Sequence, residues 1–300
     1  MRWLAPCFGH LLENRWKDVV VLQGAPVLGV LFGLDTLEGV PPVAIPVFAV
    51  ASLLVVAHVF LLNDWSDAES DHHAREKRGR IFTDRGIEPR RMLLFCSVLG
   101  AAGLAMLPAL SLWSFAFGSG VVLAGVAYSM PGIGTKGIPV ASSVTHVAGQ
   151  CLQFLMGYCL TRPPDLRGAL VSIFFALVFA AGHLNQEVRD FEGDREAGTR
   201  TNAVVFGRRT AFFASHLLFA AAFAYLGWLA VRSLVPFEAV FLVGLYPVYA
   251  LAFWRAFAEG LSYGGATRLQ SVYRAIFVAL GLGMIGIGVA RLWSASAGAP

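Results

Sequence analysis

Residues 63–71, with the sequence NDWSDAESD, follow directly on a long apolar segment. If the preceding helix continues through them, Asn63, Asp67 and Asp71 fall at i, i+4 and i+8 on one face, and Asp64 lies close to the same stripe. Carboxylates at this spacing repel one another, so the face needs a counter-charge. Oxygen ligands without interleaved Cys or His point to a hard divalent ion such as Mg2+. The alternative is a solvated, acidic helix end.

A second acidic cluster ends another apolar segment. Residues 185–201 read NQEVRDFEGDREAGTRT, in which Asp190 and Asp194 again stand at i and i+4. Two acidic clusters at the ends of two hydrophobic segments are difficult to explain as two independent helix caps. We therefore expect them to form two walls of one site.

The composition assigns the chain to the integral membrane proteins. Of its 300 residues, 57% are apolar and 14% are charged. Runs of about 18 or more mostly apolar residues, the length that crosses a bilayer core, occur nine times. These predicted spans cover residues 18–34, 43–62, 92–107, 111–128, 140–160, 169–184, 210–231, 235–254 and 276–293. The four cysteines form no C-x-x-C pair, so neither zinc nor a disulfide framework is indicated.

The basic residues predict the orientation. With the expected spans, all but four of the 23 lysines and arginines lie on the side of the two acidic clusters. By the positive-inside rule this side faces the cytoplasm, as in a bacterial-type inner membrane. The same bias explains the net charge of +4, so no nucleic-acid partner is invoked. Residues 1–17 are expected to lie at the membrane interface, and residues 63–91 and 185–209 to form cytoplasmic active-site loops of a single domain, 1–300.

Two further segments carry candidate ligands for an anionic group. Arg75 and Arg78 stand one turn apart just past the first acidic face, although a positive-inside anchor is an equal alternative. Tyr128 precedes Pro131 and a glycine-rich turn that carries Lys136, which would bring backbone and an ammonium group close to phosphate. Tyrosines at membrane interfaces are common, so this second signal is weak by itself.

Three histidines and an unusually polar fifth span are the remaining candidates. The span 140–160 contains serines, threonine and glutamines that either bond neighbouring helices or line a cavity. His58, His146 and His183 are interpreted as packed, hydrogen-bonded residues and are not included in the predicted catalytic set.

Taken together, these motifs resemble the UbiA superfamily of intramembrane aromatic and lipid prenyltransferases. The resemblance rests on N-D-x-x-D-x-x-x-D after the second span, Tyr128-Ser-x-Pro131 with Lys136, and Asp190-Phe-Glu-Gly-Asp194 followed by Gly198. It extends over nearly the whole pattern of spans. Departures from the family pattern occur where Gly79 follows Arg78 and in the first helix, which lacks a basic-proline start; these leave the acceptor unspecified.

The resemblance implies an all-α bundle of nine transmembrane helices around a central cavity, in which Mg2+ bridges both aspartate clusters to an isoprenyl diphosphate. The implied metal ligands are Asn63, Asp64, Asp67, Asp71, Asp190 and Asp194. The implied diphosphate ligands are Asn63, Arg75, Arg78 and Lys136. The implied catalytic residues are Asp67, Asp71, Asp190, Asp194, Lys136 and Tyr128, the tyrosine ring shielding an allylic cation.

The expected activity is Mg2+-dependent transfer of an isoprenyl group from an isoprenyl diphosphate to a lipophilic acceptor within the lipid membrane. A terpene cyclase that uses the same diphosphate site stays open, because the sequence defines neither acceptor nor chain length. An ion-coupled secondary transporter is a different class, but it predicts acidic residues near mid-span rather than at segment ends. CDP-alcohol phosphotransferases also use D-x-x-x-D, yet their preceding D-G-x-x-A-R run is absent.

Overall fold

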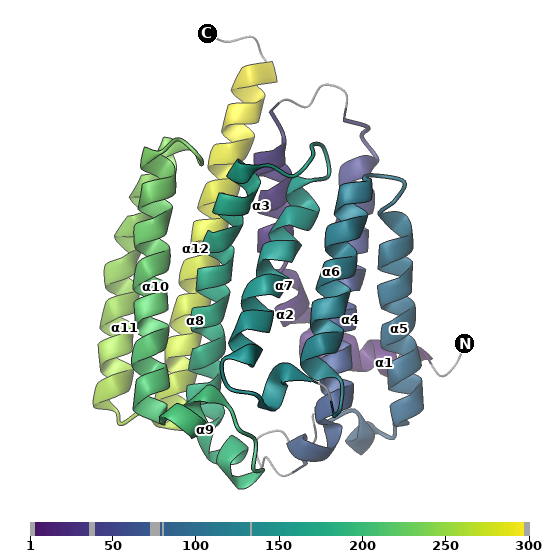
Figure 1. Cartoon of the computed structure of the whole chain (residues 1–300), viewed down its shortest axis with the longest axis vertical. Helices are drawn as coiled ribbons and strands as arrows, with labels where there is room; N and C mark the ends of the chain where they lie inside the picture. Colours follow the sequence, from purple (N-terminus) through teal and green to yellow (C-terminus); the bar gives the residue numbers. More distant parts are fainter. Residues whose placement is uncertain (1–3, 36–39, 73–78, 80, 133, 297–300) are drawn as a thin grey trace.

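The chain forms a bundle of long helices that run side by side, with short connections at both ends (Figure 1). This computed structural model describes residues 4–35, 40–72, 79, 81–132 and 134–296; the side chains of residues 70, 295 and 296 are not described. No strand occurs within these ranges.

The helices of the first half of the chain are α1 (Leu4–His10), the π-helix η1 (Leu11–Arg15), α2 (Trp16–Val21), α3 (Gly24–Gly33), α4 (Ala44–Asp71), η3 (Thr83–Arg85), α5 (Pro89–Met106), α6 (Leu112–Ser129), η4 (Thr135–Gly137) and α7 (Ala141–Tyr158). Those of the second half are α8 (Leu166–Glu196), α9 (Asn202–Phe206), α10 (Arg208–Val231), η5 (Phe237–Leu245), α11 (Tyr246–Ala258) and α12 (Tyr263–Ser296).

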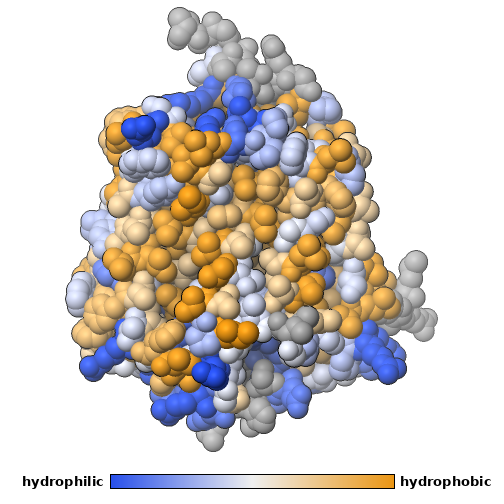
Figure 2. All heavy atoms as spheres, viewed as in Figure 1, coloured by the Kyte–Doolittle hydropathy of each residue, from blue (hydrophilic) through white to orange (hydrophobic). Residues whose placement is uncertain are grey.

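The predicted all-α membrane bundle is confirmed. Within the described part of the chain, eight helical segments are long and apolar enough to cross a membrane. The fifth expected span, 140–160, is outside this set; it corresponds to the 18-residue helix α7, which is more polar and buries Gln150 and Gln153. Figure 2 shows apolar side chains gathered across the middle of one face of the molecule and hydrophilic ones toward its two ends.

Helices α3, α4, α6, α7, α8 and α12 surround a central cavity, and each contributes residues to its lining. The other long helices lie outside this ring: α5 packs against α4, α10 against α8, and α11 against α12. Because the successive long helices from α4 to α8 alternate in direction, α4 and α8 run parallel and end at the same end of the bundle, the lower one in Figure 1.

Glycines allow two helices of the ring to touch. A Cβ added to Gly157 of α7 would overlap the backbone carbonyl of Pro26 in α3, and one added to Gly29 would overlap the carbonyl of Phe154. Small residues at such crossings let backbones approach closely, which is a common way to pack membrane helices.

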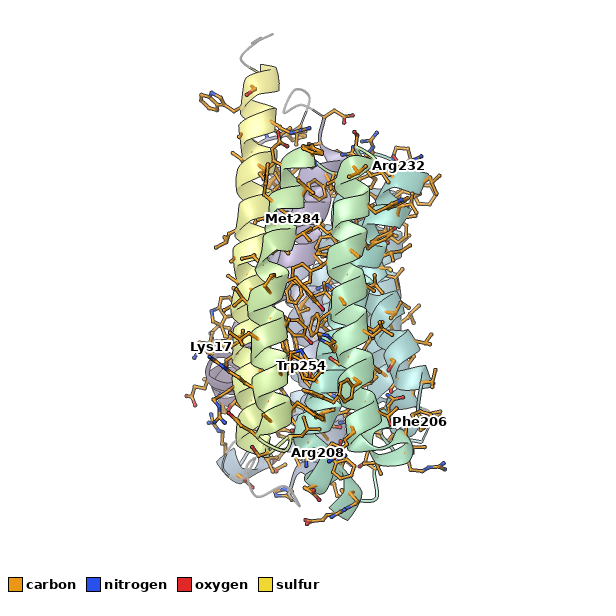
Figure 3. The ribbon with its side chains drawn as sticks, turned by 90° about the vertical axis from the view of Figure 1, so that its left-hand side faces the viewer. Lys17, Phe206, Arg208, Arg232, Trp254 and Met284 are labelled. Carbon is orange, nitrogen blue, oxygen red and sulfur yellow. The ribbon has the colours of Figure 1, made fainter. Side chains whose placement is uncertain are left out.

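Aromatic packing fixes the outer helices. Phe212 of α10 stacks on Phe253 of α11 with ring centroids 4.3 Å apart, and Phe219 stacks on Phe277 of α12 at 5.2 Å. Phe212, Phe219 and Phe253 belong to the largest buried apolar cluster of the described residues, and Phe277 packs against it. Arg208 and Arg232 lie at opposite ends of α10, and so mark the two ends of the bundle (Figure 3).

Several predicted boundaries were wrong. Both acidic clusters lie on helices: α4 continues to Asp71 and α8 to Glu196, so residues 63–71 and 185–196 are not loops. The predicted first span, 18–34, is interrupted at residues 22–23 between α2 and α3. The turn expected up to residue 274 ends much earlier, because α12 begins at Tyr263. In α4, α8 and α12 the helix continues through polar residues that no Pro interrupts, so a hydropathy limit does not mark its end.

The N-terminal segment, residues 4–21, packs against the side of the bundle near its lower end. Its helix α1 contacts α5 and η1 contacts α4 (Figure 1), and the segment buries Cys7, His10 and Leu11. The predicted position of this segment at the membrane interface stays a prediction.

Candidate active site

The acidic clusters lie on rigid extensions of two membrane-crossing helices. At 1.5 Å per residue, the 28 residues of α4 and the 31 residues of α8 span about 42 and 46 Å, against a bilayer core of about 30 Å. Each helix can therefore cross the core and still hold its last turns outside it. This geometry places carboxylates at a water-accessible end without a flexible loop.

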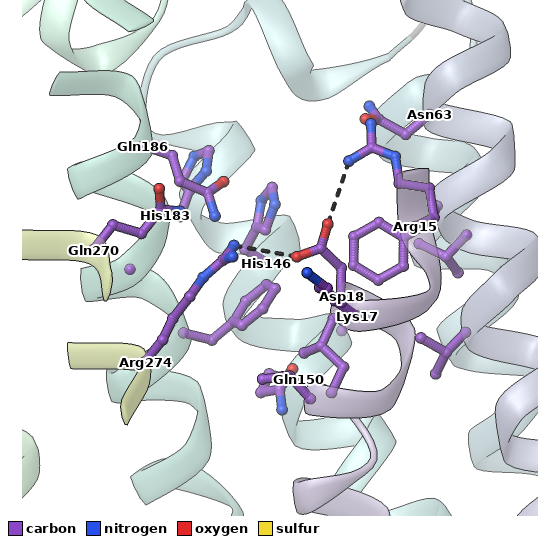
Figure 4. A pocket seen from close by; sticks show the side chains of 18 of the residues that line it. Arg15, Lys17, Asp18, Asn63, His146, Gln150, His183, Gln186, Gln270 and Arg274 are labelled. Carbon is purple, nitrogen blue, oxygen red and sulfur yellow. Dashed lines mark ion pairs between the residues drawn. The ribbon is translucent and has the colours of Figure 1, made fainter. Parts of the chain in front are cut away.

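Both clusters line one cavity of about 1650 Å3. From α4 come Asn63, Asp64, Asp67 and Asp71, and from α8 come Gln186, Asp190 and Asp194. Asn63 and Gln186 lie on opposite sides of the pocket (Figure 4). The predicted convergence of the two clusters on one cavity is therefore what the fold produces.

The cavity becomes apolar away from the carboxylates. Phe174 and Phe175 line it from α8, and Leu280 and Ile285 from α12. Phe174 lies 16 residues before Asp190 on the same helix, which corresponds to about 24 Å along its axis. The cavity thus joins a charged end to a long apolar wall.

The first wall is neutralised by a lysine from a distant loop. Lys136, on η4, forms an ion pair with the Oδ2 atom of Asp67. The Ser66 hydroxyl donates to the other carboxylate oxygen at 3.2 Å. Lys136 itself lines the cavity, as expected for a residue that contacts an anionic ligand there.

The second wall has its own counter-charge. The Arg189 guanidinium donates from Nε and Nη2 to the two oxygens of Asp190, at 2.7 and 2.6 Å. Its Nη1 atom donates to Gln270 Oε1 of α12 at 2.6 Å, so the pair also links α8 to α12. Asp194, one turn further on, lines the cavity and its backbone carbonyl accepts from the amide of Thr199.

Asp64 differs from the other aspartates in its partners. Its two oxygens accept from Arg15 Nε at 2.8 and 3.0 Å, and His10 Nε2 lies 3.0 Å from Oδ2. Both partners belong to the N-terminal segment. The predicted role of Asp64 as a metal ligand stays a prediction, but this carboxylate clearly holds the segment against α4.

Tyr128, at the last turn of α6, lines the cavity together with Asp67 of α4 and Asp194 of α8. The ring of His146 meets it edge to face at 4.5 Å between centroids. An aromatic face at this position agrees with the predicted shielding role.

Eight of the predicted site residues line the cavity: Asn63, Asp64, Asp67, Asp71, Tyr128, Lys136, Asp190 and Asp194. Arg75 and Arg78 lie outside the described residues. Among the described residues, no three His, Cys, Asp or Glu side chains come together closely enough to hold a metal ion by themselves.

Some cavity residues were not predicted from the sequence. Asp18 forms ion pairs with Arg274 of α12 at 3.2 Å and with Arg15 at 3.6 Å, and so joins α2 to α12 across the pocket (Figure 4). Glu187, which was also not predicted, is buried outside the cavity lining and accepts from Asn202 of α9 at 3.0 Å. The spacing of His183 and Glu187, i and i+4 on α8, was the available signal for a pair on one helix face.

Comparison with known proteins identifies the family. The model of the UbiA prenyltransferase family matches residues 25–262. The chain belongs to this family. It is an integral, multi-pass membrane protein and a prenyltransferase, which confirms the resemblance and the enzyme class inferred from the motifs.

Similar proteins of this family include archaeal enzymes. A digeranylgeranylglyceryl phosphate synthase from Thermococcus gammatolerans is 29% identical over 74% of this chain and 81% of its own. A lycopene elongase/hydratase from Haloferax volcanii is 31% identical over 69% of this chain and 65% of its own. Among solved structures, a UbiA homologue from Archaeoglobus fulgidus, bound to GPP and Mg2+, shares the fold with a TM-score of 0.68. The two are 20% identical, and the match covers 90% of this chain and 97% of that one.

Proposed function

We propose that this prenyltransferase moves an isoprenyl group from an isoprenyl diphosphate to a lipophilic acceptor within the membrane, with Mg2+ at the two aspartate clusters. The observation that carries the proposal is a single cavity with carboxylates, Lys136 and Arg189 at one end and an apolar wall along α8 and α12. An isoprenyl diphosphate has the same division, an anionic head and an apolar chain.

The donor set suits Mg2+. Asp67 and Asp71 from α4 and Asp190 and Asp194 from α8 offer only oxygen ligands. Mg2+ is usually bound through one or two carboxylates and completes its shell with phosphate oxygens and water. Because no three of the described carboxylates come together, a bound Mg2+ would need such phosphate and water ligands. The UbiA homologue from Archaeoglobus fulgidus, which has Mg2+ and GPP bound, supports the same assignment.

In the proposed mechanism the charged end of the cavity stabilises the leaving group. Lys136 and the Asn63 amide donate to diphosphate oxygens, and bound Mg2+ would offset the charge that grows on them as the allylic C–O bond breaks. Arg189 keeps Asp190 in position from behind. The face of Tyr128 stabilises the allylic cation, and the apolar wall excludes water that would quench it.

The acceptor is proposed to be lipid-soluble. The cavity continues along Phe174, Phe175 and Leu280, where the membrane-crossing helices present apolar surface. The relatives from Thermococcus gammatolerans and Haloferax volcanii are named for a geranylgeranylated glyceryl phosphate and for lycopene, both lipid-soluble molecules. We further propose that residues 1–300 act as one domain with the charged end in the cytoplasm, which the distribution of basic residues supports.

Incubation of the purified protein with radiolabelled geranylgeranyl diphosphate and a membrane lipid extract, with Mg2+ or with EDTA, tests the proposal. Mass analysis of the products then identifies the acceptor. We expect labelled conjugates only with Mg2+. In Asp67→Asn and Asp194→Asn, transfer should fall by at least about 100-fold, because each change removes a charge that holds the metal and the leaving group.

Asp35→Asn is the matched control. Asp35 pairs with Arg162 and is largely exposed at the other end of the bundle, so its loss should leave turnover within about twofold. Labelled hydrocarbon or alcohol formed without conjugate would favour cyclisation over transfer. Full activity in both Asp67→Asn and Asp194→Asn, with the variants folded, would rule out the metal site.

A further inference from the structure

Two histidines stack face to face in the wall of the cavity. His146 of α7 and His183 of α8 have ring centroids 4.0 Å apart with an interplanar angle of 15°. Both line the cavity, and both are visible on its far side in Figure 4. Neither belongs to the aspartate clusters, and the mechanism above does not use them.

The hydrogen bond of His146 fixes its tautomer. Its Nδ1 atom lies 2.8 Å from the backbone carbonyl oxygen of Ser142, one turn earlier on α7. Because a carbonyl oxygen can only accept, Nδ1 must carry the proton. The neutral ring therefore presents the lone pair of Nε2, which makes His146 a candidate proton acceptor on the cavity wall.

The second histidine is held by a buried carboxylate. His183 Nε2 lies 3.0 Å from Glu187 Oε1, in ion-pair range although not aligned as a hydrogen bond. Glu187 is fixed in turn by the backbone amide of Ala203 at 3.1 Å and by Asn202 Nδ2 at 3.0 Å. Glu187 thus brings a negative charge behind the histidine stack, which favours a positive charge that develops on it.

The stack also lies next to the reacting end of the cavity. Tyr128 contacts the His146 ring edge to face at 4.5 Å, and Phe179 stacks on the ring at 5.4 Å. Tyr128 lines the cavity together with Asp67 and Asp194, and the proposed mechanism assigns the allylic cation to its ring face. Since His146 is in contact with this ring and also lines the cavity, an acceptor that attacks the cation from the apolar part would approach beside His146.

We propose that His146 is the general base of the transfer, taking from the acceptor the proton that it loses when the new bond forms; this rests on the proposed function. The C1–O bond of the donor breaks and its electron pair leaves with the diphosphate. The acceptor atom, an oxygen of a hydroxyl or a carbon, bonds to C1, and its proton moves to Nε2 of His146. The imidazolium then returns the proton to solvent or to the departing diphosphate.

The proposal defines the acceptor as one with a proton to lose at the attacked position or next to it. His146 is the residue that touches the proton, and Glu187 acts through His183 as a positioning residue. The competing base is the diphosphate itself, which would need no histidine. The two candidate bases predict different results when bond formation to the acceptor is measured separately from the breaking of the donor C–O bond.

Single-turnover measurements on His146→Asn distinguish His146 from the diphosphate as the base. Asparagine keeps an N–H that can reach the Ser142 carbonyl but has no atom at the Nε2 position. With labelled geranylgeranyl diphosphate, Mg2+ and the membrane lipid extract, we expect conjugate formation to fall about 100-fold or more, the usual contribution of a general base. Diphosphate release without the extract should stay within about threefold of the wild type. Added imidazole should partly restore conjugate formation in His146→Ala.

His58→Asn is the matched control. His58 is also buried in a membrane-crossing helix and also donates from Nδ1 to a backbone carbonyl, that of Cys96 at 2.9 Å, but it does not line the cavity. The His58→Asn variant should form conjugate at nearly the wild-type rate. Glu187→Gln keeps the side-chain volume, and should lower conjugate formation about tenfold with diphosphate release unchanged. This second variant keeps the test decisive if His146→Asn fails to fold.

Unchanged conjugate formation in His146→Asn would overturn the proposal in favour of the diphosphate as base. An equal fall in conjugate formation and diphosphate release would also overturn it, because His146 would then serve the donor site. A wild-type protein that releases no diphosphate with Mg2+ would instead refute the proposed function, which keeps the two failures distinguishable.

Discussion

Lys136 and Asp67 are 69 positions apart in the sequence, yet their side chains form one ion pair at the charged end of the cavity. Each residue thereby offsets the charge of the other before any ligand is bound. The pair also keeps the ammonium group of Lys136 on the cavity wall, where a diphosphate would meet it.

Replacement of Lys136 by alanine should weaken diphosphate binding and leave acceptor binding unchanged. A charge-assisted hydrogen bond contributes about 1.5–3 kcal/mol, so the KM for the donor should rise about 10- to 100-fold. Steady-state kinetics with each substrate varied in turn measures both constants. Arg162→Ala, at the other end of the bundle, is the control. An equal rise in both KM values would assign Lys136 to general positioning.

At this scale the sequence predicted the residues of the charged end but not their partners. The i, i+4 spacing of Asp190 and Asp194 is local, so it can be read directly from the chain. The pairing of Asp64 with Arg15 is not local, and it depends on how the N-terminal segment folds back. His146 and His183 were interpreted as packing residues, because nothing in a linear pattern indicates that two distant imidazoles stack in a cavity.

Among the described helix contacts, the one between α3 and α7 leaves the least space for a side chain at its glycines. A Cβ at Gly157 would overlap the Pro26 carbonyl, and neither backbone can move without shifting a helix of the ring. We expect Gly157→Ala to destabilise the detergent-solubilised protein by about 1–3 kcal/mol through overpacking. Thermal unfolding followed by circular dichroism would measure the loss.

The same helix provides a control for this effect. At Gly149 an added Cβ would lie 3.8 Å from the Cβ of Ala124, an ordinary contact. Gly149→Ala should therefore change the stability by no more than about 1 kcal/mol, and alanine even favours the helix. Equal melting temperatures for the two variants would contradict the close packing of α3 against α7.

The N-terminal segment should depend on Asp64 for its attachment to α4. Arg15→Ala leaves a buried carboxylate with only His10 as a partner, and breaking a buried ion pair costs about 3–5 kcal/mol. Hydrogen exchange of residues 4–21 should then accelerate. Adding Asp64→Asn to Arg15→Ala should recover part of the loss, because it removes the uncompensated charge.

A metal role for Asp64 predicts a different result. Asp64→Asn would then raise the Mg2+ concentration needed for half-maximal transfer as strongly as Asp67→Asn does. An unchanged Mg2+ requirement, together with faster exchange in the N-terminal segment, would assign Asp64 to anchoring.

For the whole molecule, the two ends of the bundle should lie on opposite sides of the membrane. Glu196 is exposed at the end of α8 beside the acidic cluster, and Arg232 is exposed at the far end of α10 (Figure 3). In a background with the four native cysteines replaced by alanine, Arg232→Cys should react with an impermeant maleimide added to intact cells. Glu196→Cys should react only after the membrane is opened. The reverse pattern would place the aspartate clusters outside the cytoplasm.

The sequence by itself determined the membrane class, the approximate positions of most spans, the two aspartate clusters and the reaction class. These follow from composition, from the length of apolar runs and from motifs within about ten residues, all of which act locally. The structure has both clusters on helices that continue to Asp71 and Glu196 and line one cavity. Only the tertiary structure decided that Asp64 holds Arg15 and that His146 stacks on His183. The physical reason is that these contacts join residues tens of positions apart, and their energies depend on how the helices pack around the cavity.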